Sequence, residues 1–136
     1  MERKDVISLL AIGLAIWIVG TVYYAATGAT VLETTAARFW SAFILSPISS
    51  AALCIAILRR RCVPSEHWAP AMLLLAIPGM IGEAMVLCNF PTFMPKLHAA
   101  SAGGYGAFLF VTYAFVLSVA VAVTLGAMPR LAREEK

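Results

Sequence analysis

The stretch AGGYGAFLFVTYAFVLSVAVAVTLGA, residues 102–127, contains no charged side chain. An α-helix needs about 20 apolar residues to cross the roughly 30 Å hydrocarbon core of a bilayer, so this stretch is long enough to span a membrane. Three similar stretches precede it, at residues 6–26, 36–58 and 69–90. The sequence therefore predicts an all-α integral membrane protein, in which four transmembrane helices form a bundle within a single domain, residues 1–136.

The composition supports a membrane protein. Of the 136 residues, 62% are hydrophobic and 12% are charged, and the mean hydropathy is +0.89. Ordinary soluble domains are about 45–50% apolar and about 25% charged, and a chain this short cannot bury so much apolar surface in a soluble core. The composition argues against a soluble enzyme, a nucleic-acid-binding domain and a disordered segment. We therefore expect membrane lipid, and no nucleic acid, as a partner.

The distribution of lysine and arginine predicts the orientation of the bundle. With four spans, both termini and the loop at residues 59–68 face the same side of the membrane. Eight of the ten lysine and arginine residues lie on that side, while Arg38 and Lys96 lie on the other. Because cytoplasmic segments are enriched in these residues, we expect both termini to be cytoplasmic at an inner (plasma) membrane. The eight residues are Arg3, Lys4, Arg59, Arg60, Arg61, Arg130, Arg133 and Lys136.

The basic run Arg59–Arg61 follows the second span directly. We expect Arg59, Arg60 and Arg61 to anchor the topology, as such runs usually do. The alternative is that they bind anionic lipid headgroups.

The first span, residues 6–26, has a rival interpretation as a secretory leader. However, it is longer than the roughly 7–15 apolar residues of a signal-peptide core, and it includes Trp17. We therefore expect it to remain in the protein as a transmembrane helix.

Glu83 lies inside the third predicted span. A carboxylate at such a depth is costly and is normally paired, protonated or exposed to water. Two interpretations stay open: a site that binds a proton or a cation, and a buried ion pair or hydrogen-bonded acid that fixes helix packing. Arg38, near the start of the second span, is the expected partner, because helices joined by a short loop usually pack together. Glu33 in the first outer loop competes for Arg38.

Other polar residues are predicted to gather on the outer side with Glu83. His98 and Glu83 are too few to bind a metal, and no nucleophile–base pair, phosphate-binding loop or dinucleotide fingerprint is present. We therefore expect no metal, no cofactor and no enzymatic activity. The candidate residues for binding a ligand or a proton are Glu33, Arg38, Glu83, Asn89, Lys96 and His98.

Prolines and glycines inside the spans are expected to shape the bundle. A proline removes one helical hydrogen bond and can kink a membrane helix, and glycines allow helices to approach closely. Glycines near Glu83 could also leave a cavity beside it. Two prolines in Phe90–Pro95 argue against a regular helix there, so we expect a rigid turn or an aromatic cap. The residues assigned to packing or kinking are Pro47, Pro78, Gly79, Gly82, Gly103, Gly104 and Gly106.

Three local patterns carry a resemblance to known proteins: Ala37-Arg38-Phe39 at the start of the second span, the stretch from Pro78 to Glu83, and Phe90–Pro95. With them the chain resembles a family of small four-span bacterial inner-membrane proteins of unknown function, over nearly its whole length. The resemblance implies a four-helix fold and no catalytic residues. The likeness to the small multidrug-resistance transporters is superficial, because their essential glutamate lies in the first helix and this first span has no acid.

Two functions remain open on the sequence. The first is binding or transport of a small molecule, a lipid or a proton at an outer-leaflet site around Glu83 and Arg38. The second is a non-catalytic structural or accessory subunit of a larger membrane complex. A cavity at Glu83 favours the first function, and saturation of Glu83 by Arg38 favours the second. Four helices enclose little volume, so transport would require a homo-oligomer.

Overall fold

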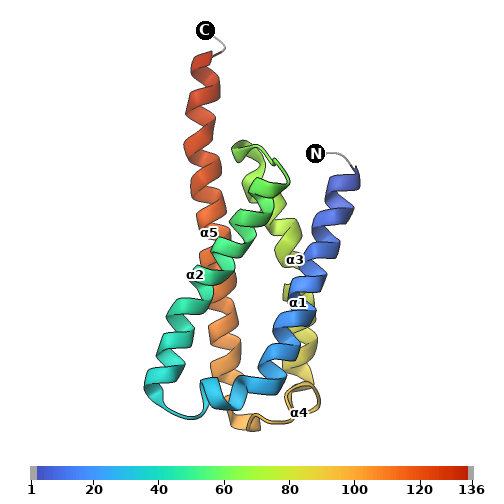
Figure 1. Cartoon of the computed structure of the whole chain (residues 1–136), viewed down its shortest axis with the longest axis vertical. Helices are drawn as coiled ribbons and strands as arrows, with labels where there is room; N and C mark the ends of the chain where they lie inside the picture. Colours follow the sequence, from blue (N-terminus) through green and yellow to red (C-terminus); the bar gives the residue numbers. More distant parts are fainter. Residues whose placement is uncertain (1–2, 135–136) are drawn as a thin grey trace.

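The computed structural model describes residues 3–134, and side chains are described for residues 3–127. Within this part the protein is all-helical, and four helices are long and apolar enough to cross a membrane (Figure 1). The prediction of an all-α fold with four spanning helices is therefore confirmed. The elements are α1 (Arg3–Leu32), α2 (Ala36–Arg60), η1 (Ser65–His67), α3 (Trp68–Cys88), α4 (Phe90–Phe93), η2 (Ala99–Ser101) and α5 (Ala102–Glu134).

The first helix is longer than the sequence predicted. It continues past residue 26 to Leu32, and these additional turns contain no proline that would end the helix. The helix α2 begins after Thr35, whose side chain accepts a hydrogen bond from the backbone N–H of Arg38 at 3.3 Å. This is ordinary N-capping, and it leaves a connection of only three residues, 33–35.

The segment that follows α3 also differs from its prediction. We expected no regular helix in Phe90–Pro95, yet Phe90–Phe93 forms one helical turn, α4. Pro91 lies in the first positions of this turn, where a backbone N–H would have no partner within the helix, so its absence costs no hydrogen bond. The expectation was wrong for this turn, and the chain leaves the helical conformation at Met94.

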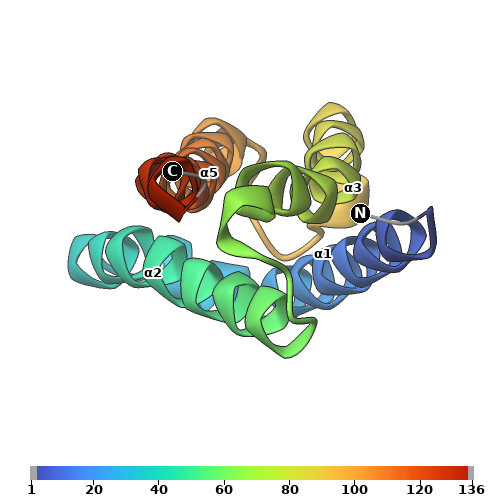
Figure 2. The same ribbon diagram turned by 90° about the horizontal axis from the view of Figure 1, so that it is seen from above.

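The helices do not pack in the order in which they follow one another. The helix α3 packs mainly against α1 and α5, and α2 packs mainly against α5. Contacts between α2 and α3 are few, so the expectation that these two helices are close neighbours was wrong. Residues 61–67 carry the chain from the end of α2 across to the start of α3, as Figure 2 shows from above.

A threonine of α5 fixes the start of α3. The Thr124 hydroxyl accepts a hydrogen bond from the backbone N–H of Ala69 at 3.0 Å and donates one to the carbonyl of Ser65 at 3.2 Å. Thr124 is buried, and His67, at the N-cap position of α3, makes no side-chain capping bond. Thr124 therefore caps α3 from another helix and fastens η1 to α5.

Two apolar clusters close the ends of the bundle. The terminus-end cluster lies where the α2–α3 loop and the N-terminus meet, and the α4-end cluster lies where α4 folds under the helices (Figure 1). The main residues of the terminus-end cluster are Leu9, Leu58, Trp68, Met72, Leu75 and Val116. Those of the α4-end cluster are Val86, Phe90, Met94, Leu97, Tyr105 and Phe108.

Both termini lie at the same end of the bundle (Figure 1), as an even number of spans requires. The side chains of Arg59, Arg60 and Arg61 are exposed at the end of α2. The side chains of Arg130, Arg133 and Lys136, which contributed to the predicted orientation, lie outside the described residues.

Candidate functional site

Glu83 is the only buried aspartate, glutamate, lysine, arginine or histidine among residues 3–127, and it is 8% exposed. It faces the interior of the bundle from α3. Its Oε2 atom accepts a hydrogen bond from the Tyr105 hydroxyl of α5 at 3.2 Å, which is long for an O–H···O bond. A carboxylate can accept about four hydrogen bonds, so this single bond leaves most of its capacity unused.

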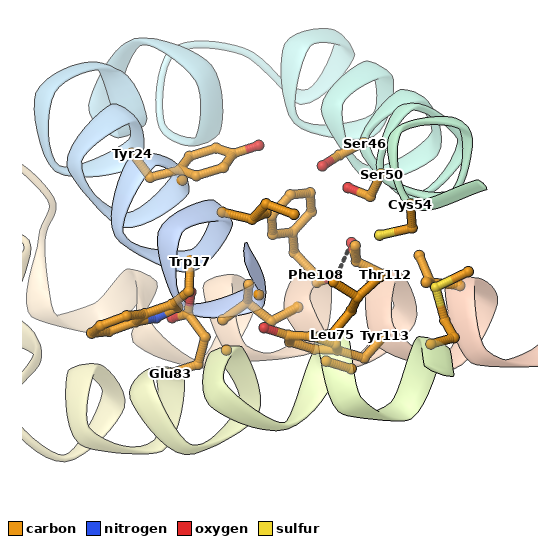
Figure 3. Close-up of a pocket in the computed structure, with 18 residues that line it drawn as sticks. Trp17, Tyr24, Ser46, Ser50, Cys54, Leu75, Glu83, Phe108, Thr112 and Tyr113 are labelled. Carbon is orange, nitrogen blue, oxygen red and sulfur yellow. Dashed lines mark hydrogen bonds between the residues drawn. The ribbon is translucent and has the colours of Figure 1, made fainter. Parts of the chain in front are cut away.

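An indole ring of α1 lies against the same carboxyl group. Trp17 and Glu83 lie side by side in Figure 3, yet the buried indole N–H has no hydrogen bond of acceptable geometry among the described residues. The hydroxyl of Thr21, one helical turn further along α1, is also buried without a partner. Most buried polar atoms are satisfied; of these two donors only Trp17 lines the cavity beside Glu83.

Two glycines of α3 make the space that the aromatic rings occupy. A Cβ atom on Gly82 would overlap the ring of Trp17, and one on Gly79 would overlap the hydroxyl of Tyr113. The aromatic side chains of Trp17 and Tyr113 can therefore lie directly against the α3 backbone in the helical turn that leads to Glu83.

A cavity of about 150 Å³ lies among α1, α2, α3 and α5 (Figure 3). A cavity of about this volume can hold a benzene molecule. Its end walls belong to the two apolar clusters, through Met72, Leu75 and Val116 at one end and Phe108 at the other. The side chains that carry polar atoms or aromatic rings at its wall are Trp17, Tyr24, Ser46, Ser50, Cys54, Glu83, Phe108, Thr112 and Tyr113.

Arg38 does not contact Glu83. It is exposed at the start of α2, where its Nη1 atom donates to the carbonyl of Thr30 at 3.5 Å. No ion pair to Glu83 exists among residues 3–127. The expected Arg38–Glu83 contact is therefore absent. Its premise was that α2 and α3 pack together, and α2 instead packs against α5.

Glu33 belongs to a separate polar group at the α4 end. Its Oε1 atom accepts hydrogen bonds from the Ser101 hydroxyl and, at 2.7 Å, from the backbone N–H of His98. The His98 ring is 4.0 Å from Oε2. The hydrogen bond from Ser101, together with the backbone bond and the charge of His98, lowers the pKa of Glu33. This ionised carboxylate fastens the end of α1 to the start of α5.

The other sequence-predicted residues of the outer side lie near this group or at helix ends. The Lys96 ammonium donates to the carbonyl of Ala26 at 3.3 Å, which further ties the loop to α1. The Asn89 side chain is exposed and donates to the carbonyl of Met85, at 3.4 Å, in its own helix. The structure thus brings Glu33, Lys96 and His98 to the end of α1, and it leaves Glu83 deeper in the bundle.

The glycines at the start of α5 do not mark a tight helix contact. A Cβ on Gly103 would meet nothing within 4 Å, and on Gly104 or Gly106 it would make only ordinary contacts, at 3.6–3.8 Å. The packing or kink role of Gly103 therefore stays a prediction. Pro47 and Pro78 lie inside α2 and α3, and both helices continue through them.

Sequence reasoning missed the aromatic residues around Glu83. Tyr105 lies in the glycine-rich start of α5, and Trp17 and Tyr113 lie in spans without charge, so nothing in the local sequence links them to an acid. It also missed Gly13, where a Cβ would overlap the backbone carbonyl of Leu75.

Comparison with known protein families places most of the chain in one of them. The model of a family described as "Family of unknown function (DUF5367)" matches residues 31–126, which include α2, α3 and most of α5 and therefore Glu83 and Tyr105. No curated protein and no solved structure matches the chain.

Proposed function

The chain belongs to the family of unknown function DUF5367, whose description names no activity. We propose a function for it from the geometry of its central cavity. The predicted resemblance to a family of unknown function is confirmed. The four apolar helices make the chain a multi-pass membrane protein. Our proposal is that it binds a small organic molecule inside the membrane, in the cavity beside Glu83.

The observation that carries this proposal is an under-used buried carboxyl group at the wall of a benzene-sized cavity. Ligand sites in proteins are usually apolar pockets with a few convergent polar groups. Here aromatic rings from α1 and α5 provide apolar walls, and the hydroxyl groups of Ser46 and Ser50 lie on α2 across the cavity (Figure 3). This arrangement fits a molecule with an aromatic body and a small polar group.

The proposed site differs from the one inferred from the sequence. It lies between the helices rather than at their outer mouth, and Arg38 does not take part. The alternative function is that of a non-catalytic accessory subunit. An ion pair that saturated Glu83 would have supported this alternative, but Glu83 has one long hydrogen bond and no ion pair among the described residues. We also propose that the protein is not an enzyme, because His67 and His98 are exposed at the ends of the bundle, away from Ser46, Ser50 and Cys54.

Filling the cavity tests the proposal. Gly20 lines the cavity, and a Cβ there would meet nothing within 4 Å, so the ring of Gly20→Phe can occupy the ligand's space. We expect the wild type to bind para-fluorobenzyl alcohol saturably, as measured by fluorine NMR on purified protein, and we expect Gly20→Phe to lose this binding. Val19→Phe is the matched control, because Val19 is exposed on the same helix.

Thermal unfolding of both variants shows whether they are folded. Saturable binding by neither the wild type nor Val19→Phe would reject the proposal and favour the accessory-subunit function. Equal binding by folded Gly20→Phe would place the site elsewhere.

We further propose that both termini face the cytoplasm at an inner membrane. The support is the exposed basic run Arg59–Arg61 at the end of the bundle where the termini lie, since such runs are retained on the cytoplasmic side. Ser65 lies at this end and Thr92 at the other, and both are exposed.

The orientation is tested by labelling single cysteines at these two positions. In a variant without Cys54, Cys62 and Cys88, a membrane-impermeant maleimide added to whole cells should label Thr92→Cys and leave Ser65→Cys unlabelled until the cells are opened. The reverse pattern would invert the proposed orientation.

A further inference from the structure

Glu83 borders two spaces, the central cavity and a groove on the outside of the bundle. The groove, of about 190 Å³, runs between α3 and α5. Glu83, Leu109 and Tyr113 line both spaces. The carboxyl group thus lies at the boundary between the interior of the bundle and the surface that faces lipid.

The groove is open because two small residues line it. Ala84 of α3 and Gly106 of α5 border it, and its rim includes Met80 and Phe110, which are exposed. Phe110 is 78% exposed on a helix that spans the membrane, so this face contacts hydrocarbon. Residues of the two apolar clusters line the two ends of the cavity. The groove therefore offers a ligand a route to Glu83 from the lipid.

Among the described residues, no positively charged side chain lies beside the Glu83 carboxyl group. Within the described part of the chain, Glu83 is the only aspartate, glutamate, lysine, arginine or histidine that lines either space. Arg38 and Lys96 bond to the backbone carbonyls of Thr30 and Ala26 instead. Acidic residues inside membranes are normally paired, protonated or exposed to water, and among residues 3–127 no cation pairs with Glu83.

We infer that the ligand is a cationic amphiphile, an amine attached to an aromatic or hydrocarbon group, which enters from the lipid through the α3–α5 groove and places its ammonium at Glu83. This inference rests on the proposed function of the cavity. An ammonium supplies the missing charge and up to three hydrogen-bond donors, and the aromatic rings of Trp17 and Tyr113 line the cavity beside Glu83. Its apolar part suits the lining of the groove.

The class of ligand is tested with two probes that share one skeleton, para-fluorobenzylamine and para-fluorobenzyl alcohol. Alkylamines are protonated at neutral pH, so the pair differs mainly in charge. Because hydrogen bonds to charged groups are the stronger ones, we expect the wild type to bind the amine at least about 10-fold more tightly than the alcohol. Glu83→Gln should bind the two equally and keep its affinity for the alcohol.

Glu33→Gln is the matched control for the charge. It removes the carboxylate of the α4 end, outside the cavity, and it should retain the preference for the amine. Equal binding of both probes by the wild type would overturn this inference and leave the proposed function standing. If the wild type binds neither the amine nor the alcohol, both this inference and the proposed function are rejected.

The route is tested by closing the groove. Gly106→Leu places a side chain between α3 and α5, whereas Gly103→Leu, one turn earlier on α5, points into open space. We expect Gly106→Leu to slow association of the amine at least about 10-fold, measured by stopped-flow tryptophan fluorescence, and Gly103→Leu to leave the rate unchanged. An unchanged rate in folded Gly106→Leu would overturn entry through the groove.

Discussion

Replacing Gly13 with alanine is expected to lower the thermal unfolding midpoint of the purified protein by about 5 °C or more. A Cβ atom on Gly13 of α1 would overlap the backbone carbonyl of Leu75 on α3. A backbone atom cannot rotate away as a side chain can, so the two helices must separate. Overpacking of this kind costs about 1–3 kcal/mol or more, and α1 packs mainly against α3.

Gly20→Ala is the matched control for this effect. It makes the same chemical change on the same helix, at a position where a Cβ would meet nothing within 4 Å. We expect its unfolding midpoint to equal or exceed that of the wild type, because alanine is the better helix former. If Gly13→Ala and Gly20→Ala unfold at the same temperature, the close approach of α1 to α3 at Leu75 does not contribute to stability.

The helices of this protein were predictable, and their partners were not. Each span is a long stretch with at most one charge, and the bilayer thickness determines the length such a stretch needs. Hydropathy carries no information about which helix lies beside which. The short connection between α2 and α3 suggested the wrong pair, and the predicted contact of Arg38 with Glu83 failed together with that pair.

The site was only partly predictable for the same reason. Glu83 is identifiable from the sequence, because a lone acid in an apolar span is unusual. Its surroundings come from α1 and α5, which are distant in sequence, and they depend on the orientation of each helix about its own axis. Tyr105 and Trp17 are ordinary residues of membrane helices until packing places them against the carboxyl group.

Replacing Thr124 with valine should destabilise the protein although the two side chains have nearly the same shape. The Thr124 hydroxyl bonds the N–H of Ala69 and the carbonyl of Ser65. Valine removes the side-chain partner of the Ala69 N–H, while the Ser65 carbonyl keeps its bond from the backbone N–H of Trp68, and an unsatisfied buried group costs about 1–3 kcal/mol. We expect a lower unfolding midpoint in detergent, measured by circular dichroism, together with faster hydrogen exchange at the N-terminal turn of α3.

Thr112→Val distinguishes this capping role from the loss of any hydroxyl group in α5. The Thr112 hydroxyl donates at 2.9 Å to the carbonyl of Phe108 in its own helix, and that carbonyl keeps its helical hydrogen bond when the hydroxyl is removed. We therefore expect Thr112→Val to unfold close to the wild-type temperature. Equal losses in the two variants would show that Thr124 acts only within α5. A loss confined to Thr124→Val would show that the start of α3 depends on a residue 55 positions away in sequence, because no side chain of its own N-cap residue closes the helix.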